Sequence, residues 1–195
     1  MSEKLRRQLI ANVDMDDTLF DYKGQLTKDL EKLRRPHEPL FEFFPGVHMP
    51  DYIIKRIRGI TATSGWWANL PKFQLGWDIW SLLGEMDFSR EILTKANLKN
   101  PNMWKGKIEC IVKNIGYNFP ATVTSSEKGR HYGNVLMDDW QNYMLNWLAH
   151  RPRGLGIMPA HPYNKDFKHP QVVRYDGTNL EEVRNRLIEL KRRYT

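Results

Sequence analysis

The chain has 195 residues, of which 41% are hydrophobic and 12% aromatic, and its formal net charge is +7. This length predicts one domain with room for a small inserted lobe. The aromatic content argues against disorder, and no apolar run reaches the roughly 18 residues of a membrane-spanning helix. The single cysteine, Cys110, excludes an intramolecular disulfide and a thiolate zinc cluster. The charged start, Met1 to Arg7, lacks the apolar core of a signal peptide, so we expect a cytoplasmic protein.

Short apolar runs that end in polar residues recur along the chain. The first run, Gln8 to Val13, ends at Asp14, and such a pattern is typical of a buried strand at the edge of a parallel sheet. Later runs of the same form are Glu91–Leu93 before Thr94, Val135–Met137 before Asp138 and Asp139, and Gly154–Met158 before Pro159, with Ala121–Thr124 as a further candidate.

Helical periodicity lies between these predicted strands. Apolar side chains recur at spacings of three and four from Met103 to Ile115, and Gly116 follows as a stop. Leu180 to Leu190 carries a second stripe, with Thr178 and Glu181 at the spacing of a capping box. Alternating strands and helices predict an α/β fold, a Rossmann-like parallel sheet with helices on both faces.

Residues 22–86 interrupt this alternation and are rich in aromatic residues, proline and glycine. Helical patterns cover Ile53 to Ile60 and Trp77 to Leu83. The segment is too long for a bare loop. We therefore predict a helical cap at 22–86, inserted after the first strand of a core domain formed by 1–21 and 87–195.

Two groups of acids follow predicted strands, Asp14 and Asp16 after the first and Asp138 and Asp139 after a later one. The carboxyl ends of parallel strands share one edge, so these side chains should converge. Close carboxylates repel one another unless a cation or a proton intervenes, and Mg²⁺ favours oxygen ligands. Helix capping would explain one aspartate but not four. The pattern predicts a magnesium site suited to phosphoryl transfer, with a carboxylate as nucleophile and another as general acid and base.

These residues, in this order, resemble the four motifs of the haloacid dehalogenase superfamily of phosphohydrolases: Asp14-x-Asp16-x-Thr18, Thr94 after a second strand, a lysine on the following helix, and Asp138-Asp139. Within that superfamily the chain is most similar to the 5′(3′)-deoxyribonucleotidases, nearly end to end. The stretch Trp66 to Pro71 resembles their aromatic cap segment, and 154–164 and 179–193 resemble their closing strand and helix.

The resemblance implies a role for each matching residue. Asp14 would be the nucleophile, and Asp16 the general acid and base that also offers its backbone carbonyl to Mg²⁺. Thr94 would hydrogen-bond the transferring phosphoryl group. Lys107 would neutralise developing charge, with Lys105 as the alternative.

Asp138 and Asp139 would complete the metal site, and which of the two binds the ion directly is left open. Tyr22, Trp66 and Trp67 would line a nucleobase pocket beneath the cap. The implied activity is magnesium-dependent removal of phosphate from nucleoside monophosphates through an aspartyl-phosphate.

Three positions depart from the family pattern. Asp17 stands where glycine is usual, Lys95 replaces a small residue after Thr94, and Trp140 follows the acid pair where arginine is common. Lys95 is a candidate to replace the phosphate contact of that arginine, which leaves the substrate open.

Two alternatives accompany the nucleotidase hypothesis: a phosphatase of the same mechanism acting on nucleic-acid ends or sugar phosphates, and a non-catalytic nucleic-acid-binding protein. Six basic residues against two glutamates between Arg90 and Lys113 keep the first of these open. The complete set of acids, threonine and lysine argues against the second, because a protein that only binds nucleic acid has no need for acids that repel phosphate. The expected partner is a nucleoside monophosphate and not a membrane. Nucleic acid and a homodimer are compatible with the sequence but not required by it.

Overall fold

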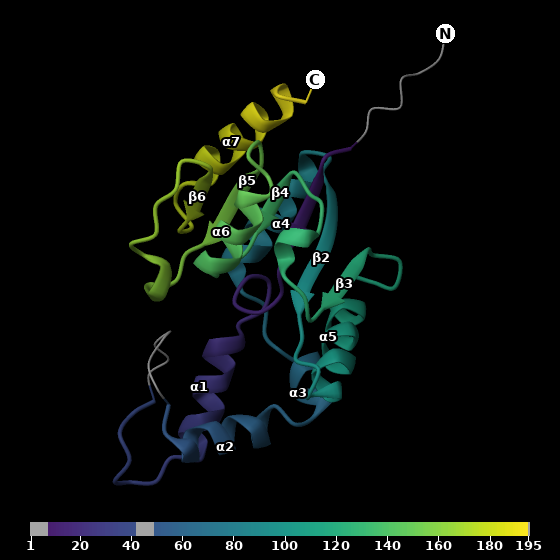
Figure 1. Ribbon diagram of the computed structural model, residues 1–195. Helices are drawn as coiled ribbons and strands as arrows, with labels where there is room; N and C mark the ends of the chain where they lie inside the picture. Colours follow the sequence, from purple (N-terminus) through teal and green to yellow (C-terminus); the bar gives the residue numbers. More distant parts are fainter. Residues whose placement is uncertain (1–7, 42–48, 195) are drawn as a thin grey trace.

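A six-stranded, entirely parallel sheet organises the chain (Figure 1). The computed structural model describes residues 8–41 and 49–194, so the charged N-terminus and residues 42–48 of the predicted cap lie outside it. The strand order is β3-β2-β1-β4-β5-β6, the order of a doubly wound Rossmann-like sheet. The strands are β1 (Ile10–Val13), β2 (Ser89–Lys95), β3 (Ala121–Thr124), β4 (Val135–Met137), β5 (Leu155–Pro159) and β6 (Val172–Tyr175). The predicted fold class is confirmed.

All five predicted runs form strands, with shifted ends for three of them. Strand β2 is longer than its apolar run because its polar residues also pair along their backbones with β1 and β3. The edge strand β6 was not predicted. Its four residues alternate half-buried Val172 and Arg174 with buried Val173 and Tyr175, and so contain no continuous apolar run.

The strands alternate their side chains between two apolar layers, as a pleated strand must. Val135 and Met137 of β4 join the larger layer, which contains residues of α4 (Gln74–Glu85), α5 (Pro101–Asn114) and α7 (Leu180–Arg192). Leu136 joins the smaller layer beneath α6 (Gln141–Ala149), a helix that was not predicted. Helices therefore cover both faces of the sheet. Within the described residues, no helix is long and apolar enough to span a membrane.

The start of α7 differs from the predicted capping box. Asn179, not Thr178, is the N-cap residue. The Thr178 hydroxyl donates to Asp176 Oδ1 at 2.7 Å, and Asn179 Nδ2 donates to Glu182 and to the Arg174 carbonyl. The capping-box prediction was wrong because the preceding turn holds the threonine hydroxyl away from the helix.

Three helices lie beyond the carboxyl ends of the strands: α1 (Tyr22–Lys32), α2 (Asp51–Ile60) and α3 (Ser64–Ala68) (Figure 1). Sequence periodicity predicted α2 but not α1 or α3. Helix α4 also falls in the range 22–86, yet Ile79 and Leu83 bury it in the layer against the sheet. Among the described residues of the predicted cap, only α1 to α3 thus stand away from the sheet, and the domain boundary at 86 stays a prediction.

Gly76 of α4 allows this helix to lie against the loop that follows β1. A Cβ atom at position 76 would come within 1.7 Å of the Thr18 carbonyl oxygen. Because that neighbour is backbone, it cannot rotate away, and the loop would have to move.

We expect Gly76→Ala to lower the free energy of unfolding by about 2–3 kcal/mol, since overpacking against backbone outweighs the gain in helix propensity. Urea denaturation followed by circular dichroism measures this. The matched control is Gly59→Ala in α2, where a Cβ meets nothing within 4 Å and propensity predicts a gain of up to about 1 kcal/mol. Equal effects of the two substitutions would show that the close approach is unimportant.

Candidate active site

The loop after β1 is a tight turn that directs its acids toward the sheet edge. The Met15 carbonyl accepts hydrogen bonds from the backbone N–H groups of Thr18, Leu19 and Phe20, and the Asp17 N–H donates to Phe20. Asp17 has a φ of 54°, in the left-handed region that glycine adopts most easily and aspartate tolerates. Asp17 is therefore compatible with this turn, although the resemblance led us to expect glycine at its position.

The strand-end acids converge, because β1 and β4 are neighbours in the sheet. One oxygen each from Asp14, Asp138 and Asp139 lies within 4.8 Å of the others, and all three residues are buried. The Asp14 N–H donates to the Met137 carbonyl at 2.9 Å, and the Asp139 N–H donates to Thr18 Oγ1 at 3.2 Å. The site therefore occupies the point where the strand order reverses, the usual ligand position in such sheets.

Lys128 lies between two of these acids and was missed by the sequence analysis. It belongs to a short 3-10 turn, Lys128–Arg130, and only 1% of it is exposed. Its Nζ lies 2.7 Å from Asp14 Oδ1 and 2.6 Å from Asp138 Oδ2, and the two carboxylates raise its pKa despite its burial. Lys128 is the one lysine between Ala121 and Asp138. Its place in the loop that leads to the strand before the acid pair was the signal by which the sequence could have identified it.

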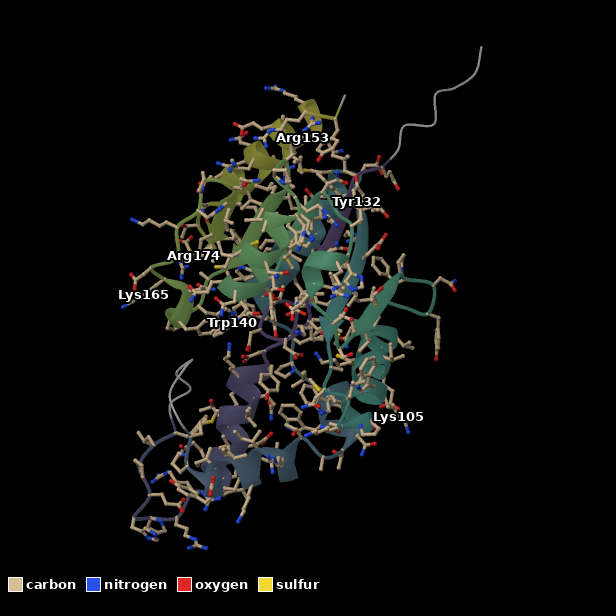
Figure 2. All side chains as sticks on the ribbon, viewed as in Figure 1. Lys105, Tyr132, Trp140, Arg153, Lys165 and Arg174 are labelled. Carbon is tan, nitrogen blue, oxygen red and sulfur yellow. The ribbon has the colours of Figure 1, made fainter. Side chains whose placement is uncertain are left out.

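Lys107 of α5 reaches the same site from the opposite side. Its Nζ lies 2.7 Å from Asp16 Oδ2 and donates to Thr94 Oγ1 at 2.7 Å. Lys105 instead points outward from α5 (Figure 2), with its side chain 67% exposed near Glu109. Of the two lysines left open by the sequence, the structure brings only Lys107 to the acids.

One carboxylate oxygen of Asp16 accepts a hydrogen bond, and the other has no hydrogen-bond partner among the described residues. Lys107 binds Oδ2, whereas Oδ1 is buried and accepts no hydrogen bond from the described residues. Burial, together with the nearby Asp14 charge, raises the pKa of Asp16, and Lys107 opposes this rise. A carboxyl group that retains a proton more readily than usual is suited to act as a general acid.

The charges of the site fit a divalent cation. Five aspartates, Asp14, Asp16, Asp17, Asp138 and Asp139, form this cluster, and three lysines are paired with them, so the carboxyl groups outnumber the ammonium groups that pair with them. Burial raises the pKa of Asp17 and of Asp138 to about 7. Carboxylate oxygens from Asp14, Asp138 and Asp139 suit Mg²⁺. The Asp16 side chain is not in this trio, so the predicted contribution of Asp16 to the metal would come from its backbone carbonyl.

Tyr163 and Lys23 hold Asp139, and the sequence contained no signal for either. The Tyr163 hydroxyl donates to Asp139 Oδ2, and Lys23 Nζ lies 3.4 Å from the same oxygen and 3.0 Å from Asp17 Oδ2. Lys23 Nζ also lies 3.6 Å from the centre of the Tyr163 ring. His161, to which no site was assigned, stacks between Phe73 and Tyr163 and is 2.6 Å from the Asp17 carbonyl. These contacts fix Asp139 and Asp17 in place.

A cavity of about 390 Å³ opens onto the acids. Tyr22 and Trp67, stacked at 5.4 Å, contribute to its wall, as does Lys95. Trp66 does not line it, because Trp66 Nε1 donates to Asp29 Oδ2 at 2.9 Å. Three of the four predicted substrate contacts therefore lie at the cavity. Trp140 and Tyr143 also line it.

The basic segment from Arg90 to Lys113 does not form one continuous face. Arg90 stacks on Trp80 at 4.5 Å and donates to its carbonyl, and Lys113 donates to Asn69. Lys107 is buried in the active site. The charge excess seen in the sequence is thus divided among separate environments.

Comparison with known proteins agrees with this architecture. No protein-family model matches the chain, and no curated protein matches it significantly. A haloacid dehalogenase-like family hydrolase from Xanthomonas campestris superposes with a TM-score of 0.53 at 15% identity, covering 95% of this chain and 98% of its own. YfnB from Bacillus subtilis, described as a HAD-hydrolase and solved with magnesium, has a TM-score of 0.49 at 13% sequence identity, and the match covers 92% of this chain and 98% of the YfnB chain. The first of these shows that the fold is shared.

We expect Mg²⁺ to stabilise the folded protein, because it relieves repulsion among buried carboxylates. After treatment with EDTA, addition of Mg²⁺ to about 100 times its Kd should raise the melting temperature by roughly 5–10 °C. Differential scanning fluorimetry measures the shift. Asp138→Asn should remove most of it, whereas Glu109→Gln on the outer side of α5 should retain it. An unchanged shift in Asp138→Asn would place the ion elsewhere.

Proposed function

We propose that this protein is a magnesium-dependent phosphatase that releases phosphate from nucleoside monophosphates through an aspartyl-phosphate on Asp14. The observation that carries the proposal is the convergence of Asp14, Asp16, Thr94 and two buried lysines beside a trio of acids that fits Mg²⁺. The related fold of the Xanthomonas protein, described as a hydrolase of the haloacid dehalogenase-like family, is in keeping with it.

The chain's own groups suit each step of such a reaction. Asp14 attacks phosphorus, so that a carboxylate–phosphorus bond forms and the ester oxygen departs with a proton from Asp16. Asp16 then removes a proton from a water molecule whose oxygen attacks phosphorus, so that the bond between the Asp14 oxygen and phosphorus breaks, inorganic phosphate leaves and the Asp14 carboxylate is regenerated. Lys128 and Lys107 neutralise charge near the reacting oxygens, and Thr94 offers a hydrogen bond. Bound Mg²⁺ supplies further charge neutralisation and orients the phosphoryl group.

The wall of the cavity supports a nucleotide rather than a plain sugar phosphate. Tyr22, Trp67 and Trp140 line a cavity whose volume suits a small ligand, and stacking of a base on an aromatic ring contributes roughly 1–3 kcal/mol. Because Tyr22 and Trp67 stack on each other, a base would pack against the part of this aromatic wall that they leave open to the cavity. A non-catalytic nucleic-acid-binding protein fits poorly, because the four aspartates that line the cavity, Asp14, Asp16, Asp17 and Asp139, repel phosphate. Phosphatase action on nucleic-acid ends is the second candidate, favoured by Lys95 at the rim.

Assays of phosphate release from a panel of compounds test which class of phosphate ester the protein hydrolyses. Nucleoside 5′- and 3′-monophosphates should be hydrolysed with kcat/KM at least about tenfold above sugar phosphates, because only the nucleotides gain base stacking. EDTA should abolish turnover and Mg²⁺ should restore it. Malachite-green assays over both sets provide the measurement. Equal rates for sugar phosphates would refute the nucleotide assignment while leaving the phosphatase intact.

Two substitutions test the catalytic residues. Asp14→Asn should lower kcat at least about a thousandfold, since the nucleophile is lost. Lys128→Gln should lower it by roughly 10²–10³, the effect of removing one charge-stabilising donor. Circular dichroism verifies that each variant is folded, and Lys105→Ala serves as the control with wild-type rates. Substantial turnover by Asp14→Asn would exclude a covalent intermediate on this residue.

A further inference from the structure

A second cavity, of about 490 Å³, adjoins the active site at the carboxyl ends of β2 and β3. Lys95, Met103 and Tyr143 line both cavities, so the two lie side by side. The remaining lining residues of this annexe are Ala96, Asn97, Leu98, Lys99 and Ser125. The cleavage reaction proposed above uses none of these five residues.

The charge of the annexe is opposite to that of the active site. Its lining contains Lys95 and Lys99 and no carboxylate, whereas five aspartates line or border the first cavity. Lys99 forms no ion pair within residues 8–41 and 49–194. Lys95 lies 3.6 Å from Glu127, but that side chain is 54% exposed, and such surface pairs contribute little. The annexe therefore favours an anionic group.

The loop that carries Lys99 is held in place before any ligand arrives. The Lys99 N–H donates to Asn97 Oδ1 at 2.9 Å, and Trp104 Nε1 donates to the Asn97 carbonyl at 3.0 Å. The Asn97 N–H lies 3.3 Å from Met103 Sδ. A loop ordered in this way loses less entropy when it binds a ligand.

The annexe is poorly suited to a second nucleobase. Tyr143 is its single aromatic residue. Two cations already lie against that ring, Lys95 at 4.8 Å and Lys128 at 5.1 Å from its centre. Cations on the ring leave little free surface for stacking, and the polar side chains of Asn97 and Ser125 favour oxygen-rich groups.

We propose that the annexe binds a second phosphate group of the substrate, so that the preferred substrates are nucleotides that carry another phosphate besides the one removed. This inference rests on the proposed phosphatase function and specifies its substrate class. The second phosphate comes either from a nucleoside bisphosphate or from the phosphodiester that links a terminal nucleotide to the next. Lys99 and Lys95 bind it while the terminal phosphate faces Asp14.

Three substrates distinguish these sources: thymidine 5′-monophosphate, thymidine 3′,5′-bisphosphate and the 5′-phosphorylated thymidine dinucleotide. The wild-type KM should be roughly three- to tenfold lower for at least one of the two longer substrates than for the monophosphate, the effect of one lysine–phosphate contact. Lys99→Ala should remove this difference and leave the monophosphate unchanged. Lys105→Ala, which changes an exposed lysine outside both cavities, should preserve the difference.

Binding to Asp14→Asn, measured by isothermal titration calorimetry with the same three compounds, separates this inference from the phosphatase proposal. If the wild-type protein hydrolyses none of the three compounds, but the second phosphate still tightens binding and this gain is lost in Lys99→Ala, the annexe is supported and the catalytic proposal fails. Equal affinities for all three compounds overturn the annexe, whether or not the enzyme is active. If Lys99→Ala weakens the binding of all three compounds by the same factor, the annexe proposal is overturned as well, because Lys99 then does not recognise the second phosphate.

Discussion

The buried ion pairs of Lys128 with Asp14 and Asp138 are the interaction on which the rest of the site depends. An isolated carboxylate in an apolar interior is so costly that it takes up a proton instead. Here one ammonium group serves acids from two adjacent strands. Because Lys107 and Lys23 come from α5 and α1, the acids are compensated only when helices on different sides of the site are in place. The acids are thus compensated only in the folded arrangement of these elements.

The lysines do not cancel all of the negative charge, and the remainder has a functional meaning. An apolar core of the same shape would be easier to stabilise, so retention of five aspartates points to a cation and a reaction. The unpartnered Asp16 Oδ1 lies beside a lysine that holds the other oxygen. In the proposed reaction one carboxylate is the nucleophile and its neighbour the acid, two roles that different surroundings can give to the same residue type.

In the proposed function, specificity comes from elements around the strand ends that carry the acids rather than from the acids themselves. Aromatic surface reaches the site from α1 and α3 through Tyr22 and Trp67, and basic surface comes from the segment after β2 through Lys95 and Lys99. Aromatic rings favour a base, and ammonium groups favour phosphate. The arrangement matches a substrate that presents both, with its terminal phosphate placed at the acids.

The sequence by itself determined the parallel sheet and the convergence of its acids, because short buried runs ending in aspartate leave few other arrangements and parallel strands share one carboxyl edge. It also pointed to Lys107, one helix after Thr94. Only the tertiary structure decided that Lys128 lies between the acids, that Tyr163 holds Asp139 and that Trp66 turns to Asp29 instead of the cavity. Such contacts depend on how a short turn or loop approaches another element, and no local periodicity encodes that approach.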